Sequence, residues 1–289
     1  MNKVYKVFPG GKFKVLTFSY DDGKIEDRRL VKLFNKFNLK ATFNLNTGII
    51  DPAIRIPQEE WPELYKGHDI AVHTFTHPTM IRLNNYNALR EILDDKDNLE
   101  KIFKRPIYGL AYPNGSYDNR IIDIAKSVGI KYARVTNDKY AATKAAEAYA
   151  ANAEGPMLLG DENGFSMPED YMRWVPTCHH NHNLVDFGKK FMALTKKQYL
   201  YMMYVWGHSY EFDNHDNWNV IEDFCAYMGG RNDIWYATNI EIIDYMDAAR
   251  RLIFSADCRR VYNPNAISVW LEIDGDTVIE VKGGTCLEI

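Results

Sequence analysis

The sequence has few of the features that mark disulfide-rich, membrane-spanning or nucleic-acid-binding proteins. Its four cysteines (Cys178, Cys225, Cys258 and Cys286) are scattered and form no C-x-x-C pair, which in a chain of 289 residues indicates buried thiols rather than a disulfide framework. No run approaches the roughly 18 apolar residues of a transmembrane helix, so no membrane span is expected. Lys and Arg number 35 against 39 Asp and Glu, a net charge of −4, and no polybasic run is present. Nucleic acid is therefore not an expected partner.

The N-terminal stretch also lacks the apolar segment of about 7–15 residues and the small-residue cleavage site of a signal peptide. We therefore expect a cytoplasmic protein, or an extracytoplasmic one if a signal peptide has been removed. The oligomeric state is left open by the sequence.

Short apolar runs alternate along the chain with longer stretches of helical periodicity. The strand candidates are 14–19, 40–46, 68–73, 107–112, 131–135, 174–178 and 202–206. The helix candidates are 27–37, 59–66, 85–103, 119–128, 140–151, 186–195 and 218–228. Such alternation predicts an α/β fold with parallel strands and covered sheet faces, closed as an incomplete or distorted (β/α) barrel.

The pattern changes near the C-terminus. Thr238-Asn-Ile-Glu241 fits a capping box and predicts a helix that runs to about Phe254. Two short strand candidates follow, Ile267–Ile273 and Thr277–Val281, around an Asp-Gly turn. We therefore expect a barrel over residues 1–254 and a small β-rich extension over residues 255–289, packed on the barrel.

Two adjacent carboxylates, Asp21 and Asp22, follow the first strand of the predicted barrel. Like charges repel, and the C-terminal ends of parallel strands are where α/β folds build their active sites. Asp-Asp-Gly is also a common turn sequence, so the pair alone does not decide between a turn and a site.

Two histidines, His73 and His77, stand at the end of another predicted strand. Pro78 disfavours a helix at His77, which places the pair on a strand-to-loop segment. Two imidazoles and a carboxylate, with one position open for water, make up a catalytic zinc site. Two solvated loop histidines are the alternative.

Together these elements resemble the polysaccharide deacetylase (NodB-homology) family. One strand ends in Thr-Phe-x-x-Asp-Asp-Gly and a later one in His-x-x-x-His, in the family's order. Further segments that resemble family motifs are Lys40-Ala-Thr-Phe-Asn44, Gly67-His-Asp-Ile-Ala-Val-His73, Ala111-Tyr-Pro-Asn-Gly-Ser-Tyr-Asp118 and Gly207-His208. The resemblance spans roughly residues 13–254.

The resemblance implies a role for each matching residue. Asp21 would be the general base that activates water, and His208 the general acid that protonates the leaving amine. Asp22, His73 and His77 would hold a divalent metal, which is zinc in most of the family, although cobalt or another first-row ion also fits. The backbone N–H of Asn114 would help to stabilise the oxyanion.

The chain departs from the family pattern at the loop arginine that pairs with the catalytic carboxylate. Ala111 stands at the matching position, and Arg134, at the end of the strand 131–135, is our candidate to replace it. The acidic residue that orients the catalytic histidine in this family is not evident. The expected sugar contacts are Tyr112, Pro113, Trp174, His180 and Trp206, although Trp206 also fits a core position.

The run Cys178-His-His-Asn-His182 places four potential metal ligands within five residues. It lacks the spacing of a structural zinc site, and a rim loop whose histidines contact the substrate is the other interpretation.

The sequence thus predicts a metal-dependent hydrolase that removes N-acetyl groups from an amino-sugar-containing glycan. Hydrolysis of a non-glycan amide or an O-acetyl ester at the same site is an alternative, because the same groups serve either acyl bond. A catalytically silent carbohydrate-binding protein is the third, and the complete set of Asp21, Asp22, His73, His77 and His208 speaks against it.

Overall fold

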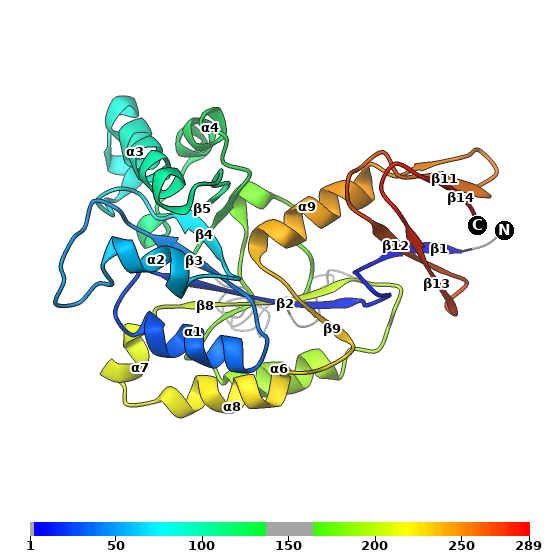
Figure 1. The fold of residues 1–289 in the computed structure, drawn as a ribbon, viewed down its shortest axis with the longest axis horizontal. Helices are drawn as coiled ribbons and strands as arrows, with labels where there is room; N and C mark the ends of the chain where they lie inside the picture. The colour runs from blue at the N-terminus through cyan, green and yellow to red at the C-terminus, as the bar shows by residue number, and fades with distance from the viewer. Residues whose placement is uncertain (1–2, 137–163) are drawn as a thin grey trace, which may run out of the picture.

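The computed structural model describes residues 3–136 and 164–289, and the helix predicted at 140–151 lies outside them. The described part contains a main parallel sheet in the order β6-β5-β4-β3-β2-β8-β7, with β9 beside β2. Its strands are β2 (Lys14–Asp21), β3 (Ala41–Leu45), β4 (Asp69–Val72), β5 (Gly109–Ala111), β6 (Tyr132–Arg134), β7 (Cys178–His179), β8 (Tyr201–Gly207) and β9 (Ile234–Tyr236). The predicted distorted (β/α) barrel is confirmed as a half-barrel of parallel strands (Figure 1).

Helices cover the sheet between successive strands (Figure 1). The α-helices are α1 (Asp27–Lys36), α2 (Trp61–Leu64), α3 (Asn85–Phe103), α4 (Asn119–Ser127), α6 (Leu184–Met192), α7 (Tyr210–Asn214), α8 (Trp218–Met228) and α9 (Asn239–Arg250). Short 3₁₀ turns are η1 (Gln58–Glu60), η2 (Met80–Arg82), η3 (Pro113–Gly115) and η4 (Tyr171–Arg173). The predicted helices 85–103 and 218–228 are confirmed residue for residue, since each carries an apolar stripe of helical period. Within the described residues, no helix combines the length and apolar character needed to cross a bilayer.

The strand predicted at 174–178 is wrong in its extent. Trp174 makes a single bridge to Arg134 at the end of β6, and the regular strand β7 begins only at Cys178, beside β8. Pro176, which lacks a backbone N–H, interrupts regular pairing between these two points. This irregular segment connects the two edges of the half-barrel.

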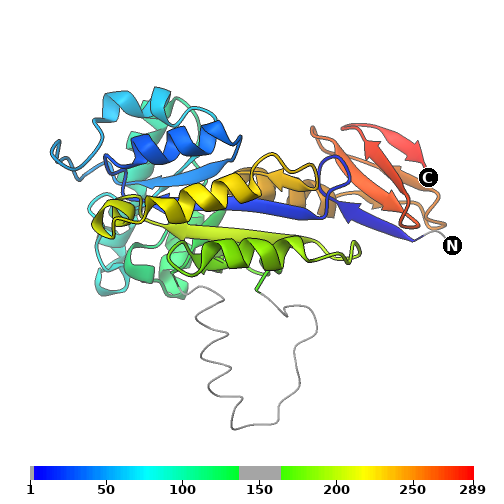
Figure 2. The ribbon, with the colours of Figure 1, turned by 90° about the horizontal axis from the view of Figure 1, so that it is seen from below.

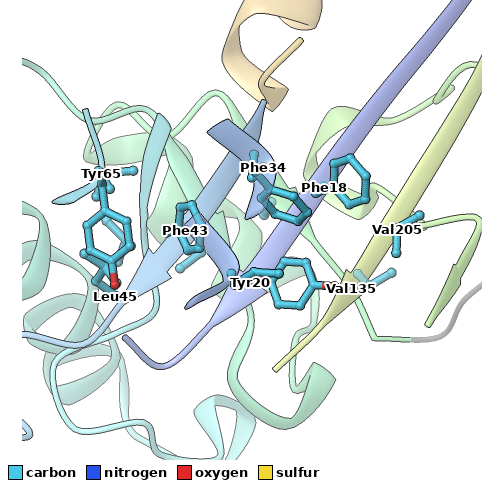
Figure 3. Packing of buried hydrophobic residues seen from close by; sticks show 14 of the residues in the cluster. Phe18, Tyr20, Phe34, Phe43, Leu45, Tyr65, Val135 and Val205 are labelled. Atoms are coloured by element: carbon cyan, nitrogen blue, oxygen red, sulfur yellow. The ribbon is translucent and has the colours of Figure 1, made fainter. Parts of the chain in front are cut away.

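The main core lies between the sheet and the helices on its outer side. Phe18 of β2 packs on Phe34 of α1 with ring centroids 4.6 Å apart, and Phe43 of β3 packs on Tyr65 at the same separation (Figure 3). All eight residues of β2 are buried, because β2 has neighbours on both sides and both faces are covered. None of the four cysteines forms a disulfide, and only Cys178 and Cys225 are buried; the prediction of buried thiols is wrong for Cys258 and Cys286.

Two small antiparallel sheets stand at the end of the barrel where β2 begins (Figure 2). One has the order β1-β12-β13 and the other β10-β11-β14. Their strands are β1 (Val4–Val7), β10 (Ile253–Phe254), β11 (Arg260–Tyr262), β12 (Val269–Ile273), β13 (Thr277–Val281) and β14 (Cys286–Glu288). The N-terminal strand β1 thus pairs with the C-terminal region, and the division at residue 254 stays a prediction.

The helix α9 begins with the predicted capping box, in which the Thr238 and Glu241 side chains each bond the other's backbone N–H. It ends at Arg250 and not near Phe254, because Ile253 and Phe254 pair with β11.

Candidate active site

Five of the predicted catalytic and metal-binding residues meet at one edge of the sheet. Asp21 is the last residue of β2, His73 follows β4, and His208 follows β8. These strands are parallel, so their C-terminal ends share one edge. Asp22 and His77 lie on the loops that continue from β2 and β4.

Asp21 is buried and surrounded by groups that stabilise its charge. One of its oxygens forms an ion pair with Arg134 and lies 3.7 Å from His73 Nε2 and 3.8 Å from His208 Nε2. The other accepts a hydrogen bond of 2.7 Å from Asn44. Burial by itself would raise the pKa of Asp21, but the Arg134 charge above all, together with the His208 charge and the Asn44 bond, outweighs it and lowers the pKa to about 2. Asp21 is therefore ionised at neutral pH.

The predicted contact between Arg134 and Asp21 is present. Arg134 comes from β6 and is fully buried. Its guanidinium also lies over the ring of Trp206, 4.6 Å from the ring centroid. The residue at the loop position, Ala111, contributes a backbone carbonyl to the site instead of a charge.

Asp22, His73 and His77 form a group whose potential ligand atoms all lie within 4.8 Å of one another. The two imidazole rings are 4.7 Å apart between centroids, and Asp22 Oδ1 lies 4.0 Å from His73 Nε2. One carboxylate and two imidazoles are a donor set that suits zinc and other first-row divalent ions.

The protonation of His73 fits metal binding. Its Nδ1 lies 2.8 Å from the backbone carbonyl of Ala111, which places the proton on Nδ1 and the lone pair on Nε2. His73 Nε2 is buried, has no hydrogen-bond partner and faces the two aspartates. Burial, the largest effect, lowers the pKa of His73 despite the neighbouring carboxylates, so the imidazole is neutral, as a metal ligand must be.

Buried polar groups hold the histidine loop in place. Asn46 donates to the backbone carbonyls of His73 and Thr74, at 2.6 and 2.9 Å. Asp95 of α3 accepts from the backbone N–H of His73 at 3.0 Å and from Thr47. These bonds fix the position of His73 before any ligand arrives.

Part of the backbone strain of the described residues lies at the site. Four non-glycine residues in or beside it adopt left-handed φ angles, namely Asp22 (82°), Thr74 (66°), His77 (56°) and Asn114 (55°). Such a conformation is costly for side chains with a Cβ, above all for the β-branched Thr74, and it persists where surrounding contacts impose it. The segments that carry the candidate ligands therefore include strained residues.

His208 is oriented by Glu211, one turn further along the chain. Its Nδ1 lies 3.1 Å from Glu211 Oε1, and its Nε2 faces Asp21. Burial would lower the pKa of His208, but the Glu211 hydrogen bond and the Asp21, Glu211 and Asp22 charges outweigh it and raise the pKa above 6.5. A charged imidazole at this position suits proton donation.

The run Cys178–His182 contributes two histidines beside Glu211. His179 and His180 approach Glu211 Oε2 at 3.2 and 2.8 Å, and these three residues form a second cluster with potential ligand atoms within 4.8 Å.

Burial corrects four of the predicted sugar contacts. The side chains of Trp174, His180 and Tyr112 are fully buried, and Pro113 is buried as well. Trp174 packs on Tyr132 and Tyr204 in the barrel interior because its segment connects the two sheet edges. These groups therefore support the site from within.

Two predicted residues remain open to solvent near the site. Trp206 is half-buried and lies edge-on to His179, with ring centroids 4.7 Å apart. Asn114 is exposed in the η3 turn that follows β5. Their roles in binding sugar and oxyanion stay predictions.

Sequence reasoning missed three residues that complete the site: Glu211, Asp95 and Arg55. Arg55 donates to the backbone carbonyl of Asp22 and lies 3.8 Å from its carboxylate. Glu211 stands three residues after His208 at the start of α7, a spacing that could have indicated it. Arg55 and Asp95 carry no local signal, since loop and helix packing bring them to the site.

Comparisons with known proteins agree with this geometry. Residues 9–133 match the family model described as polysaccharide deacetylase. A search of curated proteins finds no match.

A search of solved structures finds proteins of similar fold. A variant of peptidoglycan deacetylase PdaC from Bacillus subtilis is 13% identical over 84% of this chain and 96% of that chain, with a TM-score of 0.51. A CE4 family pseudoenzyme from Bacillus anthracis is 14% identical over 83% and 68%, with a TM-score of 0.48. Streptococcus pyogenes deacetylase PplD, in complex with acetate, is 27% identical over 42% and 55%, with a TM-score of 0.40. The chain thus spans about half the length of PplD. Residues 9–133 thus match the polysaccharide deacetylase family model, and the half-barrel built on them shares the fold of the PdaC deacetylase variant.

Proposed function

We propose that this protein is a metal-dependent deacetylase that removes N-acetyl groups from an amino-sugar-containing glycan. The observation that carries the proposal is the pairing of an ionised Asp21 with a His208 of raised pKa, 3.8 Å apart and beside the Asp22, His73 and His77 group. Two titratable groups whose surroundings push their pKa values apart supply a base and an acid.

In the proposed reaction, Asp21 accepts a proton from the water that attacks the acetyl carbon. The bond between that carbon and the sugar nitrogen then breaks. His208 Nε2 gives its proton to the nitrogen, so acetate and a free amine leave. Arg134 holds Asp21 in its ionised form and fixes the direction of its oxygens.

A divalent ion would be held by Asp22, His73 and His77, with zinc as the first candidate. When bound, such an ion polarises the acetyl carbonyl and favours ionisation of the attacking water. Arg55, which lies 3.8 Å from Asp22 Oδ1 and donates to the Asp22 backbone carbonyl, would help to hold this carboxylate beside the two histidines.

An O-acetyl ester or a non-glycan amide is the second candidate substrate, since the same base and acid serve both bonds. A silent binder is the third, as the pseudoenzyme among the solved structures illustrates. The complete and preorganised set of Asp21, His208 and the ligand group favours an enzyme.

The test combines metal content with acetate release from an N-acetylglucosamine oligomer. Asp21→Asn should keep the bound metal and lose acetate release by about 10²–10⁴-fold, the usual contribution of a general base. Asp186→Asn, at an exposed carboxylate on α6, is the matched control and should match the wild type. A chelator should abolish activity and zinc should restore it.

The outcomes separate the candidates. Bound metal with release from an acetylated ester alone would replace the N-acetyl substrate. A wild type that neither holds metal nor releases acetate would refute the enzyme and favour the binder.

A further inference from the structure

The second histidine cluster points to a role beyond the proposed base, acid and metal ligands. We infer that His179, His180 and Asn181, named here the histidine cradle, are positioning residues that hold Glu211 so that it fixes the general acid His208. The inference rests on the proposed function, which supplies the role of His208.

The two oxygens of Glu211 face different partners. Oε2 lies 2.8 Å from His180 Nε2 and 3.2 Å from His179 Nε2, and it accepts from the Asn181 side-chain amide at 3.2 Å. Oε1 is left to His208 Nδ1, at 3.1 Å. A carboxylate offers about four lone-pair positions, and this one has four nitrogen neighbours. With Oε2 held by the cradle, the other carboxylate oxygen of Glu211, Oε1, faces His208.

The tautomer of His179 follows from its own surroundings. The backbone N–H of Asn181 donates to His179 Nδ1 at 3.3 Å, so Nδ1 is an acceptor and the proton of the neutral ring lies on Nε2. This Nε2–H is the one that faces Glu211. His179 therefore presents an N–H donor to the carboxylate, and not the lone pair of a ring nitrogen.

The position of His180 is set by packing. Its ring lies between Tyr20 and Phe212, at 5.7 and 4.2 Å between centroids, and is fully buried. Gly207 makes room for it, because a Cβ at residue 207 would overlap the His180 imidazole. Gly207, the last residue of β8, thus leaves the space that the His180 ring occupies next to the strand end that carries His208.

The same three groups, His179, His180 and Glu211, could also be considered as cation ligands, since their atoms lie within 4.8 Å of one another. The donor at His179 Nε2 and the Asn181 amide on Oε2 both oppose a cation at this point. In the Asp22 group, by contrast, His73 presents a lone pair at Nε2. We therefore assign the two clusters different tasks.

The titratable groups around His208 come from three segments. Asp21 ends β2 and Asp22 follows it, Tyr210 and Glu211 lie on α7, and His179 and His180 approach from β7 and the residue after it. Glu211 stabilises the charged imidazole of His208. Displacing Glu211 should therefore lower the pKa of His208.

The test compares two substitutions at each cradle histidine. His179→Phe and His180→Phe remove the ring nitrogen that faces Glu211 Oε2 and keep an aromatic ring, whereas His179→Gln and His180→Gln keep a side-chain amide near the Nε2 position. His215→Gln, at an exposed loop histidine, is the control. We expect each Phe variant to lower kcat by about 10- to 100-fold, the value of a hydrogen bond to a charged group, with KM unchanged. The Gln variants should recover most of that loss.

Two further readouts separate positioning from structure and from metal binding. The basic limb of the kcat profile, and the pH at which His208 titrates by ¹⁵N NMR, should both move to lower pH in the Phe variants and return in the Gln variants. Bound zinc should stay at one equivalent per chain throughout. Thermal melting checks that each variant is folded, and Asn181→Ala provides a milder variant if a Phe substitution fails to fold.

Several results would overturn the inference. Two zinc equivalents in the wild type, falling to one in both Phe and Gln variants, would make the cluster a cation site, since glutamine is a poor zinc ligand. Lower activity with an unmoved His208 titration would reduce the cradle to a structural role. The NMR titration needs no substrate, so failure of the proposed deacetylation alone would leave this measurement decisive.

Discussion

The ion pair between Arg134 and Asp21 gives the most quantitative prediction. Both side chains are buried, at 1% and 3% exposure, and Arg134 Nε and Nη1 have no hydrogen-bond partner. Arg134→Met should therefore leave the Asp21 carboxylate buried without its charge partner. Removing one member of a buried pair costs about 3–5 kcal/mol of folding free energy. Asp21→Asn should in turn leave the guanidinium unpaired.

A double-mutant cycle isolates the interaction. We expect each single variant to be destabilised and the double variant, Arg134→Met with Asp21→Asn, to lose less than the sum, with a coupling energy of about 2–3 kcal/mol. Urea unfolding at pH 7 in the presence of a chelator measures the protein without bound metal. The comparison cycle uses Arg105 and Asp69, 3.0 Å apart, where the arginine is 40% exposed. Its coupling should be below about 1 kcal/mol because solvent screens the arginine.

The result that would refute the reasoning is a coupling at Arg134 and Asp21 no larger than that of the comparison pair. Asp21 would then be stabilised by His73, His208 and Asn44, and Arg134 would serve mainly through its contact with Trp206.

Three further predictions concern stability, metal binding and packing. Burial raises the pKa of Asp27 to about 7 from an unfolded value near 3.8. The stability that the protonated Asp27 allows is therefore full below pH 4 and is lost as the pH rises to 7. Asp27→Asn should change the free energy of unfolding, measured in urea, by up to about 4 kcal/mol more in the stabilising direction at pH 8 than at pH 4, and an equal effect at both pH values would contradict this. His77→Gln should weaken zinc binding by at least about tenfold in calorimetry, while His215→Gln should not. Trp174→Ala should lower the free energy of unfolding by about 3–5 kcal/mol. A change in KM without loss of stability would instead indicate that Trp174 contacts the sugar.

How far the sequence predicts this protein depends on the range of the interactions involved. The Asp21 and Asp22 pair and the two loop histidines were predictable because each motif is local and ends a strand whose apolar pattern is clear. Arg134 was predictable from its place at a strand end. Elements with strong periodicity, such as α3, were predicted with their boundaries.

Long-range packing accounts for what the sequence did not reveal. Trp174 is aromatic and near the site in sequence order, but Pro176 and the closure of the barrel turn it into the interior. The pairing of Val4 with Ile273 joins the two ends of the chain, and the local sequence of neither strand predicts its partner. His180 looked like a rim residue because nothing local shows that Gly207 opens a space beneath β8.

The burial of β2 has a consequence for how the site moves. This strand hydrogen-bonds to β3, β8 and β9 and has no exposed residue, so its amides should be among the slowest in the molecule to exchange with deuterium. Asp21 is its last residue. The proposed base therefore ends a fully buried strand with hydrogen-bonded neighbours, whereas the candidate metal ligands stand on loops. Local opening of the active site should therefore move those loops while the Asp21 carboxylate keeps its position.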